Sequence, residues 1–346
     1  CHGVAGAASV AHRGATARGA DRMPPCAETE LTTDSTPILV LNYGGWDDTM
    51  ALVSRLDADA NIWVIDNASP VNRGAELTAR FPHIHYLPLD RNWGWAGGYN
   101  RAIAHVREQG RIDHVYILNN DAMPEPGAIE RAVEQLRDHP EAAAVGSVML
   151  SDDGRHALFD GDFRHPPVDA DAVGRELVKA ERIHGGGFAL SLKAFDAVGT
   201  FHEPYFLYHE ESEWCLRARA AGWTFLVDGA SRVRHDGGGS DVNQNRQYYL
   251  TRNRYLALRR GYPLSDNDRS VRALMEWDYQ DMIWQPAVRT AILHGMADGI
   301  AGRFGPRQTG PATLGRSAML ARLRLQQIAF RARHKVRRTL RALKGG

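Results

Sequence analysis

Three polar residues, Asn119, Asn120 and Asp121, directly follow the apolar segment 115–118 (Val-Tyr-Ile-Leu). Hard divalent cations such as Mg²⁺ and Mn²⁺ take oxygen ligands and usually share them with substrate phosphates, so one carboxylate at a strand end can suffice. Asp121 suits that role, and Asn119 projects to the same side of an extended segment. The segment therefore predicts a Mg²⁺ or Mn²⁺ site, in which Asn120 is also compatible with a plain turn.

Two further apolar segments end in polar residues of the same kind. Asp66 and Asn67 follow residues 62–65. Tyr43 comes shortly after residues 38–41 and is followed by two glycines. In open α/β sheets, ligands bind outside the carboxyl ends of the strands. Asn, Asp and Gly also make ordinary turns, but three such groups in register favour a binding edge.

A histidine far along the chain is a candidate second metal ligand. His235 stands in the segment Val-Arg-His-Asp-Gly-Gly at residues 233–238. Imidazole is a common metal ligand, although a single His in a Gly-rich loop is equally compatible with a polar loop residue that binds nothing.

Residues 91–100 (Arg-Asn-Trp-Gly-Trp-Ala-Gly-Gly-Tyr-Asn) combine glycines with the start of a predicted helix. Glycine lets a ligand approach the backbone closely, and the free N–H groups of a helix start attract anions. The spacing matches neither a GxGxxG nor a GxxxxGK[ST] motif, and tight packing of a helix on a sheet explains the glycines equally well. The candidate ligand-binding residues here are Asn92, Trp95, Gly97, Gly98 and Asn100.

Three carboxylates, Glu210, Glu211 and Glu213, stand at the start of a predicted amphipathic helix, after the aromatic residues Phe206 and Tyr208. Acidic residues in a first helical turn complement the helix dipole, which is the structural alternative. Desolvation among aromatic residues and mutual repulsion would instead raise the pKa of at least one carboxyl towards that of a usable base. Sequence alone leaves both alternatives open.

Short apolar runs bounded by turn residues predict the elements that position these side chains. Runs that are apolar on both faces, with helical stretches between them, favour a buried parallel sheet built from β-α-β units. Strands are expected at residues 38–41, 62–65, 84–87, 115–118, 143–150, 185–192 and 224–227. Residues 151–171, rich in Asp, Gly, His and Pro, predict a loop-dominated insertion. The predicted fold class is α/β, with a mostly parallel central sheet flanked by helices and a helical C-terminal extension.

The 346 residues, 43% hydrophobic and 24% charged, are enough for one main domain with appendages. Residues 1–36 lack periodicity and are interpreted as a disordered or cloning-derived leader. The main domain is predicted over residues 37–262, followed by a helical basic region over 263–346. Scattered cysteines and the lack of an apolar run of roughly 18–20 residues predict a cytoplasmic protein, with a peripheral position at the inner face of the membrane left open.

The C-terminal region is strongly basic, because no acidic residue follows Asp298. Leucines and other apolar residues among the arginines of 316–344 predict amphipathic helices. Such helices either lie on an anionic membrane surface or pack on the main domain with a solvated Arg face, and both alternatives stay open. A homodimer is also left open, and nucleic acid is not an expected partner.

Taken together, these segments resemble the family-2 glycosyltransferases with a GT-A fold, particularly their rhamnosyltransferase-like members. The resemblance runs from about residue 37 to 262. Its carriers are residues 41–43 (Leu-Asn-Tyr), 64–69 (Val-Ile-Asp-Asn-Ala-Ser), 92–100, 118–121 (Leu-Asn-Asn-Asp), and 206–217 followed by 221–223 (Ala-Gly-Trp).

The resemblance implies an enzyme that moves a sugar from a nucleotide-diphosphate sugar, a dTDP- or UDP-sugar, to an acceptor hydroxyl. It implies that Asp66 reads the nucleotide base, that Asp121 holds the metal on the diphosphate, and that a general base lies in the Glu210–Glu211 pair. His235 matches the family's His before a Gly pair. The candidate donor-binding residues are Asn42, Tyr43, Asp66, Asn67, Asn92, Trp95, Gly97, Gly98, Asn100, Asn119, Asn120 and Gly186.

The sequence departs from the family pattern at two places. Such sequences usually carry Glu-Asp where this chain has Glu210 and Glu211, which leaves open which of the two is the base. The metal motif has a single carboxylate, Asp121, where the fuller pattern has two. The implied mechanism is one in-line displacement that inverts the anomeric carbon, with Glu211 taking the acceptor proton.

Two other classes of protein share some of these features. A nucleotidyltransferase that makes a nucleotide sugar would also bind a metal diphosphate on an α/β sheet, but no Gly-rich loop carrying Lys and Arg follows the first strand. A non-catalytic sugar-binding protein is the second alternative. The retained Asp66, Asp121 and Glu211 argue against it.

Overall fold

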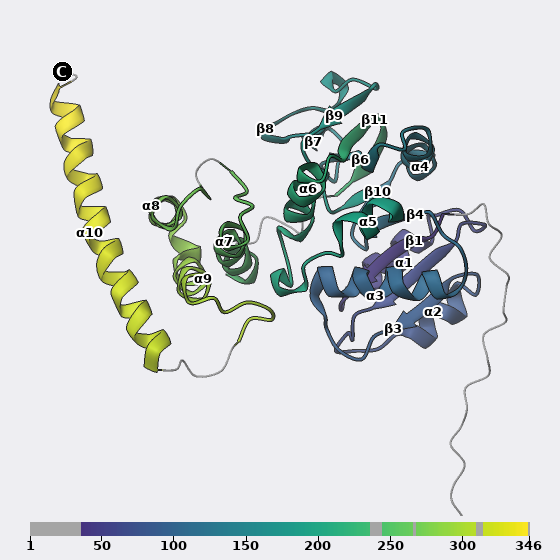
Figure 1. The fold of residues 1–346 in the computed structure, drawn as a ribbon, viewed down its shortest axis with the longest axis horizontal. Coiled ribbons are helices and arrows are strands. Elements are labelled where there is room, and N and C mark those ends of the chain that lie inside the picture. Colours follow the sequence, from purple (N-terminus) through teal and green to yellow (C-terminus); the bar gives the residue numbers. More distant parts are fainter. Residues whose placement is uncertain (1–35, 236–243, 266–267, 309–313, 345–346) are drawn as a thin grey trace, which may run out of the picture. The chain divides into compact units, whose positions relative to one another are not determined.

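The computed structural model describes residues 36–235, 244–265, 268–308 and 314–344 (Figure 1). Almost all of the predicted leader, residues 1–36, lies outside these ranges, as do the residues that directly follow His235.

One sheet, drawn with its helices in Figure 1, organises the chain up to Arg234. Its parallel half has the order β3-β2-β1-β4 and consists of β1 (Ile38–Asn42), β2 (Ile62–Asp66), β3 (His85–Pro88) and β4 (His114–Asn119). Its other half contains β10 (Gly187–Ser191), β6 (Ala142–Leu150), β11 (Thr224–Arg234), β5 (Met123–Pro124), β9 (Leu177–Ala180), β7 (His156–Phe159) and β8 (Phe163–Asp169).

The direction of β10 decides which residues meet at the edge of the sheet. This strand lies between β4 and β6 and is antiparallel to both, so β6 runs the same way as β4. β11 is parallel to β6. The carboxyl ends of β1, β2, β4 and β11 and the amino end of β10 therefore lie at one edge.

Two expectations about the sheet need correction. The sheet is mixed rather than mostly parallel, because β10, β9, β7, β8 and β5 all pair antiparallel with their neighbours. The loop-dominated insertion expected at residues 151–171 is wrong over 156–169, where β7 and β8 form a hairpin beside β6. Its short strands lack the apolar run by which sequence analysis recognises a buried strand.

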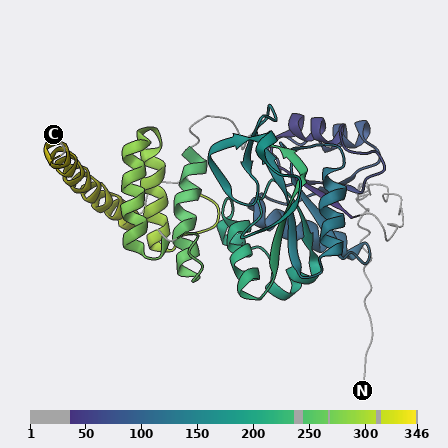
Figure 2. The ribbon, with the colours of Figure 1, turned by 90° about the horizontal axis from the view of Figure 1, so that it is seen from above.

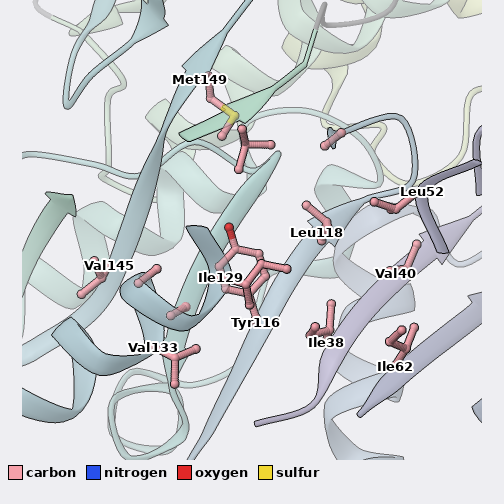
Figure 3. Packing of buried hydrophobic residues seen from close by; sticks show 14 of the residues in the cluster. Ile38, Val40, Leu52, Ile62, Tyr116, Leu118, Ile129, Val133, Val145 and Met149 are labelled. Carbon is pink, nitrogen blue, oxygen red and sulfur yellow. The ribbon is translucent and has the colours of Figure 1, made fainter. Parts of the chain in front are cut away.

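Helices cover both faces of the sheet and bury their apolar stripes against it. One face carries α1 (Trp46–Val53), α2 (Gly74–Arg80) and α4 (Ala128–Asp138), and the other carries α3 (Gly94–Glu108), α5 (Leu192–Val198) and α6 (Glu210–Ala220). In α4 the buried positions Ile129, Ala132, Val133 and Leu136 repeat at helical spacing. Figure 3 shows Ile129 and Val133 packed against Val145 and Tyr116 of the sheet.

Four further helices follow the sheet: α7 (Gln244–Arg259), α8 (Val271–Trp284), α9 (Arg289–Ala301) and α10 (Leu314–Lys344). Tyr255, Leu274 and Met296 form a core with Leu320 and Leu323 of α10. Helices α7 and α9 pack against each other (Figure 2). Short 3-10 helices lie at Ala170–Ala172, Glu203–Tyr205 and Pro286–Val288. No helix in the described ranges is both long and apolar enough to span a membrane.

Candidate active site

The predicted metal ligands meet at the edge where β4 and β11 end. The Nε2 atom of His235 lies 3.1 Å from Oδ1 of Asp121 and 3.2 Å from Nδ2 of Asn119. The His235 side chain is only 9% exposed, whereas that of Asp121 is 41% exposed, so one side of the pair faces solvent. The sheet thus brings together Asn119, Asp121 and His235, as the sequence analysis predicts.

Hydrogen bonds around Asn119 make this edge suitable for a cation. The indole Nε1–H of Trp95 donates to Oδ1 of Asn119 at 3.4 Å, which turns the Asn119 amide nitrogen towards His235. If that amide donates to Nε2 of His235, then Nε2 and the Asp121 carboxylate face each other with lone pairs. A positive charge between them would stabilise this arrangement.

A second histidine, His184, extends the cluster and was missed by the sequence analysis. Its ring makes an edge contact with His235, with ring centroids 5.6 Å apart, and its Nδ1 accepts a 3.0 Å hydrogen bond from the Gly186 N–H. Burial, together with the nearby His235, lowers the pKa of His184 to about 3, so the ring is neutral at physiological pH. When Nε2 of His235 instead carries a proton, its hydrogen bond and positive charge outweigh burial, which alone would raise the pKa of Asp121, and leave that pKa lowered.

The two glutamates at the start of α6 occupy different surroundings. Glu210 is 2% exposed, and its Oε2 has no hydrogen-bond partner among the described residues. Burial raises the pKa of Glu210 well above its usual value, and the adjacent charge of Glu211 raises it further. Burial also raises the pKa of Glu211, whose Oε1 accepts a 3.1 Å hydrogen bond from the Ser212 hydroxyl.

Glu211 lies beside Gly185, as does Trp95. A Cβ placed on Gly185 would lie 3.6 Å from the Glu211 carboxyl carbon and 3.6 Å from Cζ2 of Trp95. The same Trp95 ring donates to Asn119 at its other edge. The position of Gly185 therefore lies against both the Glu211 carboxylate and the Trp95 indole, and the indole in turn contacts Asn119.

Asp66 and Tyr43 form the other side of the edge. Asp66 is 2% exposed, accepts a 2.9 Å hydrogen bond from the Ser69 N–H and a 3.1 Å one from the Tyr86 hydroxyl. Tyr43 is 53% exposed directly after β1. A fixed carboxylate beside an exposed aromatic ring is suited to a planar, hydrogen-bonding ligand such as a nucleobase.

Several residues that were predicted to bind the nucleotide-sugar donor make hydrogen bonds that stabilise loops. Asn42 and Asn120 both contact Thr49 at the start of α1, where Asn120 also donates to the Gly45 carbonyl at 3.1 Å. Asn67 donates to the side chain of Asn92 and accepts from the Trp93 N–H, each near 3 Å. These amides stabilise the turns that follow the strand ends. That they also bind the nucleotide-sugar donor stays a prediction.

The glycines of α3 have a packing explanation. A side chain on Gly97 would lie 2.8 Å from Cβ of Trp93, and one on Gly98 would lie 2.6 Å from Cδ1 of Leu41. Glycine at both positions therefore allows α3 to pack closely against Trp93 and Leu41. This is the structural alternative that the sequence analysis gave for these glycines. Asn100 donates to the Phe201 carbonyl at 2.9 Å and braces the segment before α6.

Gly186 and His184 reach the edge because β10 runs antiparallel to β4. The Asn119 N–H donates to the Gly186 carbonyl at 3.1 Å. His184 precedes three glycines and a buried strand, a signal that the sequence contains. The strand direction, which places the start of β10 beside the end of β4, was not available from the sequence.

Sequence comparison places the chain among known glycosyltransferases. The sequence model described as "Glycosyl transferase family 2" matches residues 49–216, a range that includes Asp66, Asp121 and Glu211. The low-salt glycan biosynthesis hexosyltransferase Agl10 of Haloferax volcanii is 28% identical over 247 residues, which are 67% of this chain and 78% of that protein. The N-acetylglucosaminyl-diphospho-decaprenol L-rhamnosyltransferase of Mycobacterium tuberculosis is 24% identical over 59% of this chain and 76% of that protein.

A solved structure shows the same fold. The mannosyltransferase PcManGT from Pyrobaculum calidifontis, in complex with GDP-Man and Mn²⁺, is 14% identical and gives a TM-score of 0.50, covering 90% of this chain and 86% of that chain. The predicted GT-A fold, with its helical C-terminal region, is thereby confirmed. The chain is a glycosyltransferase that is similar to glycosyl transferase family 2 over residues 49–216, and among the relatives named it resembles the hexosyl- and rhamnosyltransferases.

Proposed function

We propose that the chain is an inverting glycosyltransferase in which Glu211 is the general base and a divalent metal is bound at Asp121 and His235. The observation that carries this proposal is the pair of contacts made by Trp95. Its indole ring lines the space beside Gly185 that the Glu211 carboxylate also borders, and its N–H holds Asn119 next to His235.

The reaction we propose is a single displacement. Glu211 accepts the proton of the acceptor hydroxyl while that oxygen forms a bond to the anomeric carbon. The bond from the anomeric carbon to the diphosphate oxygen breaks, and its electron pair leaves on the nucleoside diphosphate. Because the nucleophile enters opposite to the leaving group, the configuration inverts. A base with a raised pKa is suited to this step, since general-base efficiency is greatest when the pKa lies near the working pH.

Glu211 is the better of the two candidate bases. Glu210 is buried without a partner for its Oε2, so it has no path to an acceptor hydroxyl in this conformation. Its charge, when present, opposes ionisation of its neighbour. We therefore assign Glu210 an electrostatic role and keep proton transfer for Glu211.

The residues present fit a divalent ion. In an octahedral site with ligands at about 2.1 Å, neighbouring ligand atoms lie about 3 Å apart, and the Asp121 Oδ1 to His235 Nε2 distance is 3.1 Å. Among the described residues, no group of three His, Cys, Asp or Glu side chains could hold a metal ion by itself. The donor diphosphate would therefore complete the coordination, and the ion would supply charge stabilisation for the departing diphosphate.

We propose a dTDP- or UDP-sugar as the donor, with the base lying between Tyr43 and Asp66. A titration panel of dTDP, UDP and GDP in the presence of Mn²⁺ tests this, followed by transfer assays with the corresponding sugars. Tight binding of GDP alone would overturn the assignment. Turnover of nucleoside triphosphate and sugar phosphate, without transfer, would instead favour a nucleotidyltransferase, and binding without any turnover a sugar-binding protein.

We further propose that α10 contacts an anionic membrane surface. Leu320 and Leu323 of this helix are buried in the helical core, whereas Leu325 is 70% and Ile328 63% exposed among exposed arginines. One face of α10 packs on α8 and α9. The other presents apolar and cationic side chains suited to a lipid surface. A lipid-linked acceptor, such as the relative from Mycobacterium tuberculosis uses by its name, would be met there. Light scattering of the purified chain tests the homodimer that the sequence leaves open.

A further inference from the structure

The loop that leads into Glu210 and Glu211 has an unusual backbone. Phe206, Tyr208 and His209 have φ angles of +64°, +68° and +73°. Side chains other than glycine rarely adopt this region, and such residues persist where the surrounding structure over-determines them. Residues 205–209, called the base loop below, therefore need partners that fix them.

Asn253 of α7 is the principal partner of this loop. Its side chain is fully buried, and its Nδ2 points at three backbone carbonyls, those of Tyr205, Leu207 and Tyr208, at distances of 3.0, 2.8 and 2.7 Å. The side-chain amide of Asn can donate two hydrogens to neighbouring carbonyl oxygens and carries no charge. It can therefore be buried here at a lower desolvation cost than the ammonium group of a lysine.

Arg252 fixes the orientation of that amide. Its Nε and Nη2 donate to Oδ1 of Asn253 at 2.9 and 2.8 Å, and Nη2 also donates to the Tyr205 carbonyl at 2.8 Å. With the amide oxygen occupied by a guanidinium, the NH₂ group must face the loop. Arg252 is itself fully buried and lies over the ring of Tyr249, 4.7 Å from its centroid.

The opposite side of the base loop is held by elements already placed in the donor site. The Trp95 N–H donates to the Phe206 carbonyl at 2.7 Å. The Phe206 ring stacks on Tyr249 of α7, with centroids 5.5 Å apart. All four carbonyls from Tyr205 to Tyr208 thus have a donor within hydrogen-bond distance. The Trp95 N–H serves Phe206, the two hydrogens of Asn253 Nδ2 are shared among the other three, and Arg252 also donates to Tyr205.

We propose that Arg252 and Asn253 are a positioning pair that sets the backbone of the base loop and thereby the place of the Glu211 carboxylate. The proposal rests on the proposed role of Glu211 as base. Neither residue touches the space around Gly185, so neither is assigned contact with a substrate. Because the contacts to the donor edge come from α3, losing the pair should disturb proton transfer far more than donor binding.

The test compares Asn253→Asp and Asn253→Ala with the parent chain. Asn253→Asp keeps the shape and replaces the donor NH₂ by an acceptor that faces carbonyl oxygens, and Asn253→Ala serves if the aspartate variant does not fold. Misplacing a catalytic group by about 1 Å can cost about 10²-fold in rate, so we expect kcat to fall by that factor while the Kd of the Mn²⁺–nucleotide complex changes by less than about threefold.

The matched control is Tyr255→Phe. This variant removes another buried hydrogen bond of α7, the 2.7 Å bond from the Tyr255 hydroxyl to Asp278, on the side that packs on α8. It should lower the thermal midpoint as the Asn253 variants do, yet keep kcat near the parental value. An equal loss of kcat in Tyr255→Phe at an equal loss of stability would show a merely structural role and overturn the proposal.

Amide hydrogen exchange of the peptide that covers residues 203–209 provides a readout independent of activity. The Phe206 and Leu207 N–H groups are bonded within this segment, and they should exchange faster in the Asn253 variants but not in Tyr255→Phe. Unchanged exchange would overturn the positioning role even if kcat fell. If exchange accelerates but Glu211→Gln proves fully active, the positioning role stands and the assignment of the base fails.

Discussion

The backbone N–H of Trp95, at the start of α3, donates a 2.7 Å hydrogen bond to the carbonyl of Phe206, in the loop before α6. Through this bond the element that borders the donor edge also holds the loop that leads to Glu211. The approach is so close that a Cβ on the adjacent Gly94 would lie 2.1 Å from the Phe206 oxygen.

Gly94→Ala should therefore destabilise the protein strongly. Gly94 has a φ of +72°, so alanine adds backbone strain to the clash with Phe206. We expect a loss of about 2–4 kcal/mol in the free energy of unfolding, measured by urea denaturation. Gly110→Ala is the control, because its Cβ would meet nothing within 4 Å, and it should stay within about 0.5 kcal/mol of the parent. A stable Gly94→Ala variant would contradict the close approach.

Substitution of each glutamate separately should distinguish the base from its neighbour. Glu211→Gln removes the proton acceptor, so turnover should fall by about 10²–10⁴-fold while nucleotide binding persists. Glu210→Gln keeps the buried shape and replaces a carboxyl whose Oε2 has no hydrogen-bond partner among the described residues, so turnover should fall much less. Initial rates at saturating donor decide between them. The reverse ranking of the two variants would make Glu210 the base.

Activity and stability should both depend on the protonation of this pair. Transfer needs an ionised base, and burial raises the pKa of Glu211, so the acid limb of kcat against pH should lie above that of an exposed glutamate. Because the folded state holds these protons to a higher pH than the unfolded state, stability should fall as pH rises through the raised pKa values.

Glu210→Gln provides the check on this dependence. Burial and the Glu211 charge raise the pKa of Glu210, so the stability of the variant relative to the parent should increase as pH rises from about 4.3, where an exposed glutamate ionises, through the raised pKa. Thermal midpoints at several pH values measure this. A difference between the two proteins that does not grow with pH would contradict the raised pKa.

Removal of either proposed ligand should abolish the metal dependence of donor binding. For Asp121→Ala and His235→Ala, calorimetric titration with nucleoside diphosphate should show the same weak affinity with and without Mn²⁺, because the ion then keeps at most one protein ligand. Asp59→Ala, an exposed carboxylate outside the edge, is the control and should retain the Mn²⁺ effect. Mn²⁺-dependent binding that survives in Asp121→Ala would remove this residue from the metal site.

Vesicle co-sedimentation tests the exposed face of α10. The double substitution Leu325→Gln and Ile328→Gln removes two exposed apolar side chains without entering the helical core. Binding to phosphatidylglycerol vesicles should drop, and binding to phosphatidylcholine vesicles should be weak throughout, because the arginines attract anionic lipid. Val71→Gln, at an exposed position outside α10, is the control. Equal sedimentation of parent and double variant would contradict membrane contact through this face.

Several strands and the polar residues at their ends can be predicted from the sequence, because they depend on local residue patterns. The apolar runs ending at Asn42, Asp66 and Asn119 fix three strands, and parallel pairing brings their polar ends to one edge. The acidic start of α6 is likewise visible as a cluster of glutamates after aromatic residues. Such features depend on neighbours in the chain, which is why a pattern suffices to predict them.

Tertiary structure alone decided the rest, because it depends on strand direction and on contacts between distant segments. The antiparallel course of β10 brings His184 and Gly186 beside Asn119, and no local pattern shows that direction. The burial of Glu210 and the position of Glu211 beside Gly185 and Trp95 separate two adjacent glutamates that the sequence cannot rank. Asn253 reached three carbonyls of the base loop only when α7 packed against it, since the order of residues along α7 does not show which backbone its amide will meet.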